Sequence, residues 1–199
     1  MTPTVRPARS EEARTLAAIL IFSFPELSLR ILGREPAHTL DFWTQTLEDT
    51  WGSGQWYVVE STGDALAGMG WMSSGPSANP LHSPEACRQY FGPWRGRWVS
   101  WALGLVDSPE MEAGQVYLDW IAVALSWRRQ GLGRQLVLGL VEIAEGKGMS
   151  QVELEVEERK PHAKELYLQC GFREGKTRWN PLLTLIYSFS PLTKMIRDL

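Results

Sequence analysis

In the first half of the chain, some segments repeat their hydrophobic residues with the period of a helix and others with the period of a strand. Apolar residues recur at helical spacing over residues 13–21, behind Ser10 as N-cap and an acidic first turn. Residues 37–50 predict a second helix, which Gly52 and Gly54 end. Strands are predicted at residues 4–8, 55–61 and 65–74, the last two joined by a turn at Thr62, Gly63 and Asp64.

Residues 85–106 predict a helix in two pieces, broken at Gly92–Pro93 because proline lacks an amide hydrogen and clashes with the preceding turn. Three of the ten tryptophans, Trp94, Trp98 and Trp101, share one face of the second piece. Tryptophans at this spacing usually pack in a core, and we expect these to do so. The alternative is an aromatic pocket that attracts an ammonium group or packs an apolar substrate.

The second half of the chain is more regular. It predicts strands at residues 115–123, 151–157 and 192–199 and helices at residues 131–148 and 160–172. The apolar stripe of the first of these helices comprises Leu132, Leu136, Leu140 and Ile143. Residues 151–157 alternate like a strand with one wet face. Strands covered by helices in both halves indicate the mixed α/β class.

Composition narrows the classes of function. The chain has 199 residues, enough for a single domain, residues 1–199, with a substantial core. No run of about 18 apolar residues suggests a membrane span, and a net charge of −3 argues against a general nucleic-acid-binding surface. The two cysteines, Cys87 and Cys170, have no metal-ligand spacing and fit a reducing compartment. We therefore expect a cytoplasmic protein with no metal and with neither nucleic acid nor membrane as partner.

Two glycines, Gly131 and Gly133, stand between the strand and the helix predicted around them. The first amides of a helix lack intrahelical partners and carry about half a positive charge, and glycines let a phosphate approach the backbone closely. Charged side chains nearby are Arg128, Arg129 and Arg134. The Walker A and dinucleotide-binding patterns both fail here, because the lysine–hydroxyl pair and the third glycine are missing. The turn predicts an anion site, with a tight turn that holds no ligand as the alternative.

Two motifs follow one another in this half. Arg128, Gly131 and Gly133 form an Arg-x-x-Gly-x-Gly core after a strand, and residues 163–172 read Ala-x-x-Leu-Tyr-x-x-x-Gly-Phe. In this order and at this separation they resemble the GNAT N-acyltransferase superfamily, closely over about residues 115–175 and loosely over nearly the whole chain. Lys160 departs from the family, which often has asparagine there. Because lysine only donates hydrogen bonds, one contact to the pantetheine arm is in doubt, and Lys160 could instead reach a phosphate.

The resemblance implies a GNAT-like mixed α/β (α+β) fold, with a mostly antiparallel central sheet flanked by helices and one strand pair splayed at the coenzyme site. It also implies acetyl-CoA as cosubstrate. Backbone groups of Ile121 and Val123 would bind the pantetheine, and the Ile121 amide would point at the thioester oxygen. The expected coenzyme-binding residues are Ile121, Ala122, Val123, Arg128, Arg129, Gln130, Gly131, Leu132, Gly133, Arg134, Lys160 and Tyr167.

By the same resemblance, Tyr167 protonates the departing thiolate, for which a phenol of pKa about 10 is suited. The alternative is that Tyr167 only packs on its helix face. Asp119 is our candidate for the base, because period-two alternation gives it the side-chain face of Ile121 and Val123. The alternative is a solvated carboxylate that attracts a cationic substrate. Cys170 is expected to lie buried and inert.

The acceptor side carries little signal. The family resemblance implies that residues 22–40 and 74–106 wall the acceptor pocket, and other side chains within reach are His38, His82, Glu26 and Glu35. His162, after a proline at a helix start, is expected at the surface or near the coenzyme.

The expected activity is direct acetyl transfer from acetyl-CoA to a primary amine of a small molecule or peptide, in a ternary complex. A non-catalytic acyl-CoA-binding or regulatory module is the alternative, and a nucleoside-triphosphate enzyme is a third reading. Many family members pair, which leaves a homodimer open.

Overall fold

A single sheet organises the molecule. The computed structural model describes residues 4–32, 36–51, 55–61, 65–75, 79–106 and 109–199. Within them, seven strands lie in the order β1-β2-β3-β4-β5-β7-β6, and every neighbouring pair is antiparallel except β4 and β5. The strands are β1 Val5–Pro7, β2 Gln55–Glu60, β3 Leu66–Ser73, β4 Gln115–Val123, β5 Gln151–Glu157, β6 Arg173–Arg178 and β7 Leu192–Asp198. The expected mixed, mostly antiparallel sheet is confirmed.

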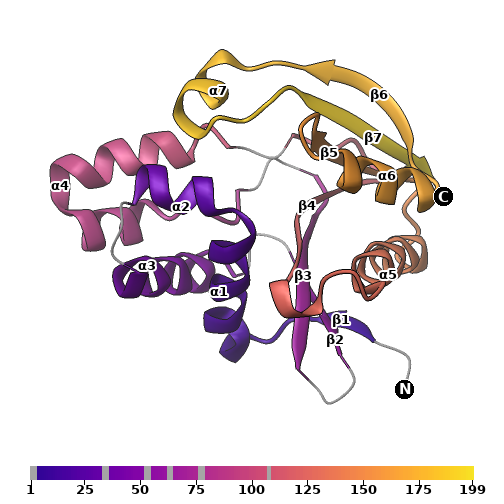
Figure 1. Ribbon diagram of the computed structural model, residues 1–199, viewed down its shortest axis with the longest axis horizontal. Helices are drawn as coiled ribbons and strands as arrows, with labels where there is room; N and C mark the ends of the chain where they lie inside the picture. Colours follow the sequence, from indigo (N-terminus) through magenta and orange to yellow (C-terminus); the bar gives the residue numbers. More distant parts are fainter. Residues whose placement is uncertain (1–3, 33–35, 52–54, 62–64, 76–78, 107–108) are drawn as a thin grey trace.

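Helices cover both faces of this sheet (Figure 1). They are α1 Ala13–Ser23, α2 Pro25–Ile31, α3 Pro36–Asp49, α4 Pro84–Leu103, α5 Leu132–Gly146, α6 Pro161–Gln169 and α7 Pro181–Tyr187, with 3-10 turns η1 Ser10–Glu12 and η2 Leu125–Trp127. The first four helices lie on one side of the sheet and α5 and α6 on the other, while α7 belongs to the connection between β6 and β7.

Each face of the sheet carries its own hydrophobic core. On the side of α1–α4, Trp43, Trp56 and Trp71 are almost completely buried. On the other side, Leu136 and Leu140 project from α5 onto the sheet, as the helical stripe predicts. Full burial of one such aliphatic side chain contributes about 1.5–3 kcal/mol. The sheet is therefore held between two cores, which fixes the positions of the strand ends that form the site below.

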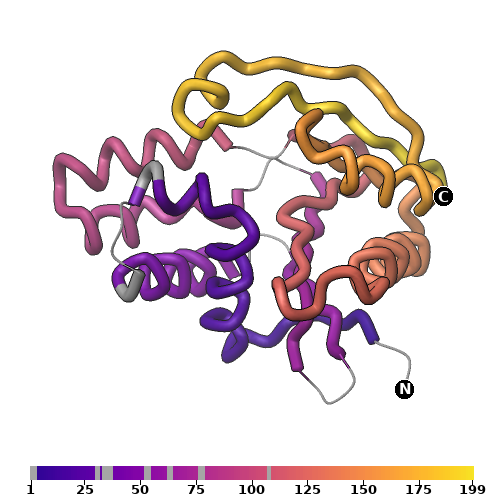
Figure 2. The backbone as a smooth tube through the Cα atoms, in the orientation of Figure 1, coloured from indigo at the N-terminus to yellow at the C-terminus, as the bar shows by residue number. Residues whose placement is uncertain are grey.

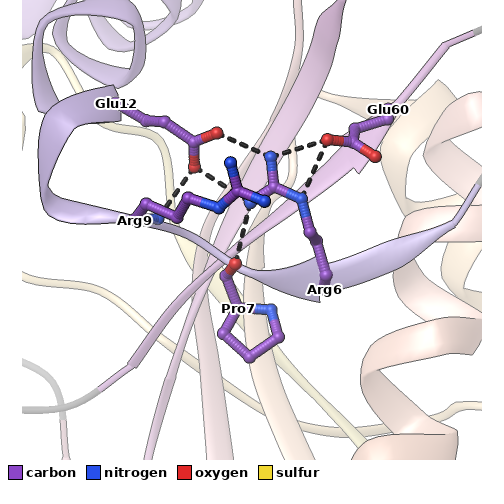
Figure 3. Close-up of polar contacts among 5 residues, drawn as sticks. All are labelled: Arg6, Pro7, Arg9, Glu12 and Glu60. Atoms are coloured by element: carbon purple, nitrogen blue, oxygen red, sulfur yellow. Dashed lines mark hydrogen bonds and ion pairs between the residues drawn. The ribbon is translucent and has the colours of Figure 1, made fainter. Parts of the chain in front are cut away.

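Arg6 links the edge strand β1 to two other elements (Figure 3). Its guanidinium donates hydrogen bonds of 2.6 and 3.0 Å to Glu12 of η1 and of 2.6 and 2.8 Å to Glu60 of β2. It also donates to the Pro7 carbonyl at 3.0 Å, and the Glu12 carboxylate accepts from the Arg9 amide at 2.8 Å. Hydrogen bonding from Arg6 lowers the pKa of Glu12, although burial opposes the shift. This ionic cluster anchors the start of the chain to the sheet.

Most of the predicted elements are confirmed, and the details differ at the first helix. The expected N-cap, Ser10, is instead the first residue of η1, and the cap position belongs to Arg9. The reason is that the Glu12 carboxylate, and not the Ser10 hydroxyl, accepts the hydrogen bond from the Arg9 amide. The expected turn at Thr62, Gly63 and Asp64 and the helix end at Gly52 and Gly54 lie outside the described residues.

Three elements were not predicted. Strand β6 is polar and exposed at every position, so it shows no alternation of buried and exposed residues. Helices α2 and α7 each have seven residues, too few to display a helical period against their surroundings. All three depend on contacts with distant segments, since β6 pairs with β7 and α7 packs on α2.

Helix α4 breaks at Gly92–Pro93, as predicted. Gly92 has φ 72° and ψ −179°, a conformation that favours glycine, and Figure 2 shows the two arms of α4 meeting at a bend at one end of the molecule. The side chains of Trp94, Trp98 and Trp101 are 85%, 46% and 52% exposed. The expectation that they form a core is therefore wrong, because smaller residues fill the buried face of this arm: Gly96, Val99, Ala102 and Leu103.

Candidate active site

The glycine turn lies between η2 and the start of α5. Gly131 is the N-cap of α5 and has φ 81°, in the left-handed region that favours glycine. A Cβ on Gly133 would meet its neighbours only at 3.5 Å or more, so the packing of the chain itself leaves room for a side chain there. Residues 128–131 are exposed. The amides that open α5 are therefore accessible to an anion, as the sequence predicts.

The arginines of this turn differ in their surroundings. Arg128 donates from Nε to the Val123 carbonyl at 2.9 Å and from Nη2 to the Ser23 hydroxyl at 3.3 Å, which ties the turn to the end of β4 and to α1. Arg129 and Arg134 are exposed. Arg128 is exposed as well, so all three arginines place positive charge at the surface beside the α5 amides.

Strands β4 and β5 separate beyond Leu118. Their parallel ladder joins Gln115 to Gln151 and ends with Leu118 opposite Leu154. The later part of β4, from Asp119 to Val123, keeps its pairing with β3 alone. The splayed strand pair expected from the family resemblance is therefore present, and it leaves backbone groups of β4 facing the gap.

A cavity of about 160 Å³ occupies this gap. Polar and charged side chains from β4, β5, α6 and β6 line it: Tyr117, Asp119, Glu155, Glu157, Lys160, Tyr167 and Arg178. Apolar side chains complete the lining, among them Phe24, Leu105, Val106, Leu183 and Phe189. The cavity lining is therefore partly charged and partly apolar.

A β-bulge decides which way Asp119 points. Trp120 and Ile121 of β4 together stand opposite the single residue Gly70 of β3, and Trp120 has φ 53°. Asp119 pairs with Trp71, whose side chain belongs to the core under α1–α4. Ile121 packs instead against the core under α5. The prediction that Asp119 shares the face of Ile121 and Val123 is wrong, because the extra residue reverses the alternation.

Tyr167 reaches the cavity from α6, on the side of α5. It is 8% exposed and packs edge-to-face on Phe172, with ring centroids 6.0 Å apart. Burial raises the pKa of Tyr167, and the charge of Asp119 acts in the same direction. The phenol therefore stays protonated throughout the neutral pH range. Tyr167 both packs on its neighbours and lines the cavity. The structure is therefore compatible with a role as proton donor and with a role in packing alone.

Strand β5 carries three glutamates whose face was predicted to be wet. Glu153 and Glu157 are only 3% and 9% exposed, so that prediction is wrong. In the sheet β7 lies beside β5 and β6 lies beyond β7. These two strands supply Lys194 and Arg178, whereas Lys160 follows β5 in the chain. The ion pairs are Glu153 with Lys194, Glu155 with Arg178 and Glu157 with Lys160, each at 2.6 Å.

Sequence analysis missed Tyr117, Glu155 and Arg178 as site residues. The Tyr117 hydroxyl is hydrogen-bonded to Glu155, and burial raises the pKa of this phenol well above its usual value. Arg178 binds the same carboxylate and contributes from the unpredicted strand β6. The alternating glutamates of residues 151–157 were the available indication, but Arg178, the partner of Glu155, lies 23 residues away in the chain.

Lys160, at the position where the family often has asparagine, lies at the cavity. Its ammonium is 2.6 Å from Glu157 and 5.2 Å from the centre of the Phe24 ring. These contacts place the Lys160 side chain at the gap between β4 and β5. The expectation that it contacts a phosphate stays a prediction.

The other acceptor-side candidates lie apart from this cavity. His38 is exposed and packs edge-on against Tyr90, and His82 is 2.9 Å from the Ser100 hydroxyl. Neither of them lines the cavity, nor do Glu26 on α2 and the exposed His162 on α6; Glu35 lies outside the described residues. Cys170 is buried, and burial raises the pKa of its thiol, as expected for an inert cysteine.

The described residues contain neither a metal-binding cluster nor a membrane-spanning helix. Among them, no three histidine, cysteine, aspartate or glutamate side chains gather closely enough to hold a metal ion. Among the same residues, no helix has the length and apolar character needed to cross a bilayer.

Comparison with known proteins agrees with this geometry. The model of a family described as the acetyltransferase (GNAT) family matches residues 19–172. Over 103 residues the chain is 30% identical to N-acetyltransferase family 8 member 3 of Rattus norvegicus. That stretch covers 47% of this chain and 44% of the rat protein, so the match spans less than half the length of this relative.

Solved structures share the fold at low sequence identity. An N-acetyltransferase from Staphylococcus aureus Mu50 superposes with a TM-score of 0.67 at 19% identity, covering 97% of this chain and 99% of the other. A GNAT acetyltransferase from Elizabethkingia anophelis with acetyl-CoA bound gives a TM-score of 0.59 at 15% identity, covering 99% and 98% of the two chains. At these identities the likeness concerns the fold alone.

Proposed function

Because the chain belongs to the GNAT acetyltransferase family, we propose that it transfers the acetyl group of acetyl-CoA directly to a primary amine of a small molecule or peptide. The observation that carries this proposal is the part of β4 beyond Leu118, which faces a cavity beside the accessible amides of α5. In the ternary complex the amine nitrogen attacks the thioester carbonyl, the C–N bond forms and the C–S bond breaks. The amine loses one proton and the thiolate gains one, so the step balances without a covalent enzyme intermediate.

The coenzyme is held by backbone groups at two places. The first amides of α5, from Gly131 onward, bind the diphosphate, and the exposed Arg129 and Arg134 add attraction. The pantetheine pairs with the free edge of β4 at Ile121 and Val123, in the manner of an added strand. The Ile121 amide then donates to the thioester oxygen, where negative charge develops in the transition state. A donor already in position lowers the barrier because it needs little reorganisation.

Tyr167 and Asp119 each carry out one of the two proton transfers, and their side chains lie on opposite sides of the sheet. The bulge at Trp120 puts Asp119 on the face of α1–α4, whereas Tyr167 comes from the face of α5 and α6. Tyr167 protonates the leaving thiolate from the coenzyme side, and Asp119 accepts the proton of the amine from the acceptor side. This arrangement supports direct transfer, since acid and base act on different atoms and do not compete for one position.

The lining of the cavity supports a small acceptor with an apolar body. Three carboxylates, Asp119, Glu155 and Glu157, face two cations, Lys160 and Arg178, which leaves a net negative charge that favours an ammonium group. The apolar part of the lining would pack the remainder of the amine. An arylalkyl or alkyl monoamine therefore fits this site better than a long polyamine, whose second ammonium would meet apolar side chains.

A thiol-release assay tests the activity. Purified protein with acetyl-CoA is offered phenethylamine, spermidine and an alanine-initiated peptide, and we expect the fastest release of coenzyme A with the monoamine. Isothermal titration with acetyl-CoA and, separately, with ATP and magnesium measures binding in the same samples. Tighter binding of ATP than of acetyl-CoA would overturn the coenzyme assignment.

A second candidate function is a non-catalytic acyl-CoA-binding or regulatory module. The observation that favours it is the position of Lys160 at the cavity. Its ammonium contacts both the Glu157 carboxylate and the Phe24 ring. Acetyl-CoA binding without thiol release from any amine, and equally without release after Lys160→Asn substitution, would identify the chain as this module.

A further inference from the structure

Helix α4 forms a helical hairpin. Its arms meet so closely at Gly96 that a Cβ there would lie 2.5 Å from the Cys87 carbonyl oxygen. The bend at Gly92–Pro93 stands at one end of the molecule, on the side of the sheet opposite α5 and α6 (Figures 1 and 2). The hairpin therefore presents a surface that is remote from the coenzyme-binding turn.

The second arm of this hairpin exposes a tryptophan stripe, which we define as Trp94, Trp98 and Trp101. The three positions are spaced by four and three residues, so they share one helix face, and their side chains are 85%, 46% and 52% exposed. Trp94 directly follows the bend and is the most exposed of them. Soluble surfaces seldom expose contiguous large apolar side chains unless a partner covers them.

The second arm of the hairpin carries only positive charge, on Arg95 and Arg97, whereas the first arm pairs Arg88 with Glu85. Residues 86–106 contain three arginines and no aspartate or glutamate, although the whole chain has a net charge of −3. Arg97 lies between Trp94 and Trp101 on the same face and is exposed. Arg95 is engaged elsewhere, because it donates to the Leu32 carbonyl at 2.8 Å.

A groove of about 600 Å³ lies beside the stripe and is lined by both arms of the hairpin. Its lining includes Arg88 from the first arm and Arg97, Ser100 and Trp101 from the second. Arg88 forms an ion pair with Glu85 on its own arm, and both side chains are largely exposed. Two guanidinium groups therefore stand at an open groove next to exposed indole rings.

We propose that the hairpin of α4 docks on an anionic lipid bilayer. Indole rings favour the level of the lipid headgroups, because one part of the ring is apolar and its N–H finds a hydrogen-bond partner there. Arginines beside them are attracted to anionic headgroups, and Arg88 and Arg97 can take phosphates in the groove between the arms. The combination of apolar anchors and one-signed charge distinguishes this face from a dimer interface, where identical positive patches would meet.

Vesicle co-sedimentation tests the proposal. The protein is mixed with vesicles of phosphatidylcholine alone or with about 30% phosphatidylglycerol added, at low and at high salt. We expect binding to the anionic vesicles, little binding to the neutral ones, and weaker binding at high salt because the attraction is screened. Substitution of all three stripe residues by alanine is expected to reduce the partition coefficient about tenfold or more, and Arg88→Gln with Arg97→Gln to reduce it on anionic vesicles only.

A matched control is available in Trp179, which is 64% exposed after β6 and outside α4. Trp179→Ala is expected to bind vesicles like the original protein. Circular dichroism and the unfolding temperature establish that every variant is folded, which is expected because the substituted side chains are exposed. The proposal is overturned if the original protein stays in the supernatant with anionic vesicles, or if the triple variant binds as well as it does. It is also overturned if the triple variant only converts a dimer to a monomer in light scattering.

Discussion

Arg178 of β6 holds Glu155 of β5 through two hydrogen bonds of 2.6 Å, one from Nε to Oε1 and one from Nη2 to Oε2. The two strands are not neighbours, since β7 lies between them in the sheet. The pair therefore spans a whole strand and forms part of the wall of the cavity beside Tyr117. A two-fold contact between planar groups fixes their orientation as well as their distance.

Replacing Arg178 by alanine is expected to lower kcat/KM and to lower the free energy of unfolding by about 1 kcal/mol. The loss of stability is small because the arginine is half-exposed, whereas the loss of activity follows from an unbalanced carboxylate in the cavity. Steady-state kinetics and urea unfolding measure the two effects. Arg173→Ala is the control, since Arg173 also lies on β6 and pairs with Asp198 at 3.3 Å, away from the cavity. If Arg178→Ala and Arg173→Ala changed kcat/KM equally, Arg178 would have no specific role in the active site.

Replacing Gly131 by alanine is expected to weaken acetyl-CoA binding about tenfold or more, because the φ of 81° at the start of α5 is unfavourable for alanine and the amides would shift. Titration calorimetry measures the affinity. Gly148→Ala is a matched control: Gly148 has φ 74° beyond the other end of α5, and a Cβ there also meets nothing within 4 Å. The control should lose similar stability and keep its affinity. Unchanged affinity in Gly131→Ala, and also after valine is placed at both 131 and 133, would contradict the diphosphate site.

Replacing Tyr167 by phenylalanine is expected to lower kcat about 100-fold while the dissociation constant of acetyl-CoA stays unchanged. In the proposed mechanism the Tyr167 hydroxyl donates the proton to the thiolate. Burial raises its pKa, so the original enzyme should keep this step active to alkaline pH. Tyr187→Phe is the control. The Tyr187 hydroxyl donates to the Ala102 carbonyl at 2.5 Å, so its loss should reduce stability and leave kcat intact. If Tyr167→Phe had the same kcat as the original protein, the role of Tyr167 would be limited to packing.

Replacing Asp119 by asparagine separates its two readings. As a base, Asp119 removes the amine proton, so the substitution should lower kcat about 100-fold. As a carboxylate that only attracts a cation, it should affect KM for the amine and spare kcat. Asp41→Asn, at an exposed ion pair with Arg14, is the control and should change neither constant.

Replacing Glu12 by glutamine is expected to cost about 2 kcal/mol of stability at neutral pH, because both side chains of the pair with Arg6 are mostly buried. The pKa of Glu12 is lowered in the folded state, first by the hydrogen bonds from Arg6. Its contribution is therefore complete above the unfolded pKa of about 4.3 and is lost as the pH falls through the lower folded pKa. Urea unfolding at pH 7 and at about pH 3 should show the difference between the two proteins shrinking in acid. A difference independent of pH would mean that packing, not the carboxylate, is responsible.

Local patterns in the chain were sufficient for much of the fold. The helical stripe of α5, the break at Gly92–Pro93 and the glycines at the start of α5 each depend on a few adjacent residues, and the structure has all three. Such features follow from backbone sterics and from a hydrophobic period that is visible within one element.

The direction of Asp119 shows where such patterns stop. Strict alternation over Gln115–Val123 gives it the face of Ile121, but one extra residue in β4 against β3 turns it to the other side. A bulge is a property of two paired strands, so no periodicity along one strand reveals it. The same holds for Glu155, which the alternation predicts to be solvated but which pairs with Arg178 of β6, on the far side of β7.

The amino-acid order by itself determined the class of fold, the glycine turn at Gly131 and the helix that carries Tyr167, because each is encoded by neighbours in the chain. Only the tertiary structure decided which face Asp119 takes, that Arg178 neutralises Glu155, and that the stripe at Trp94 remains uncovered. Those outcomes depend on register, on pairs of charges more than twenty residues apart, and on which surfaces find a partner, and these are fixed only when the distant segments pack together.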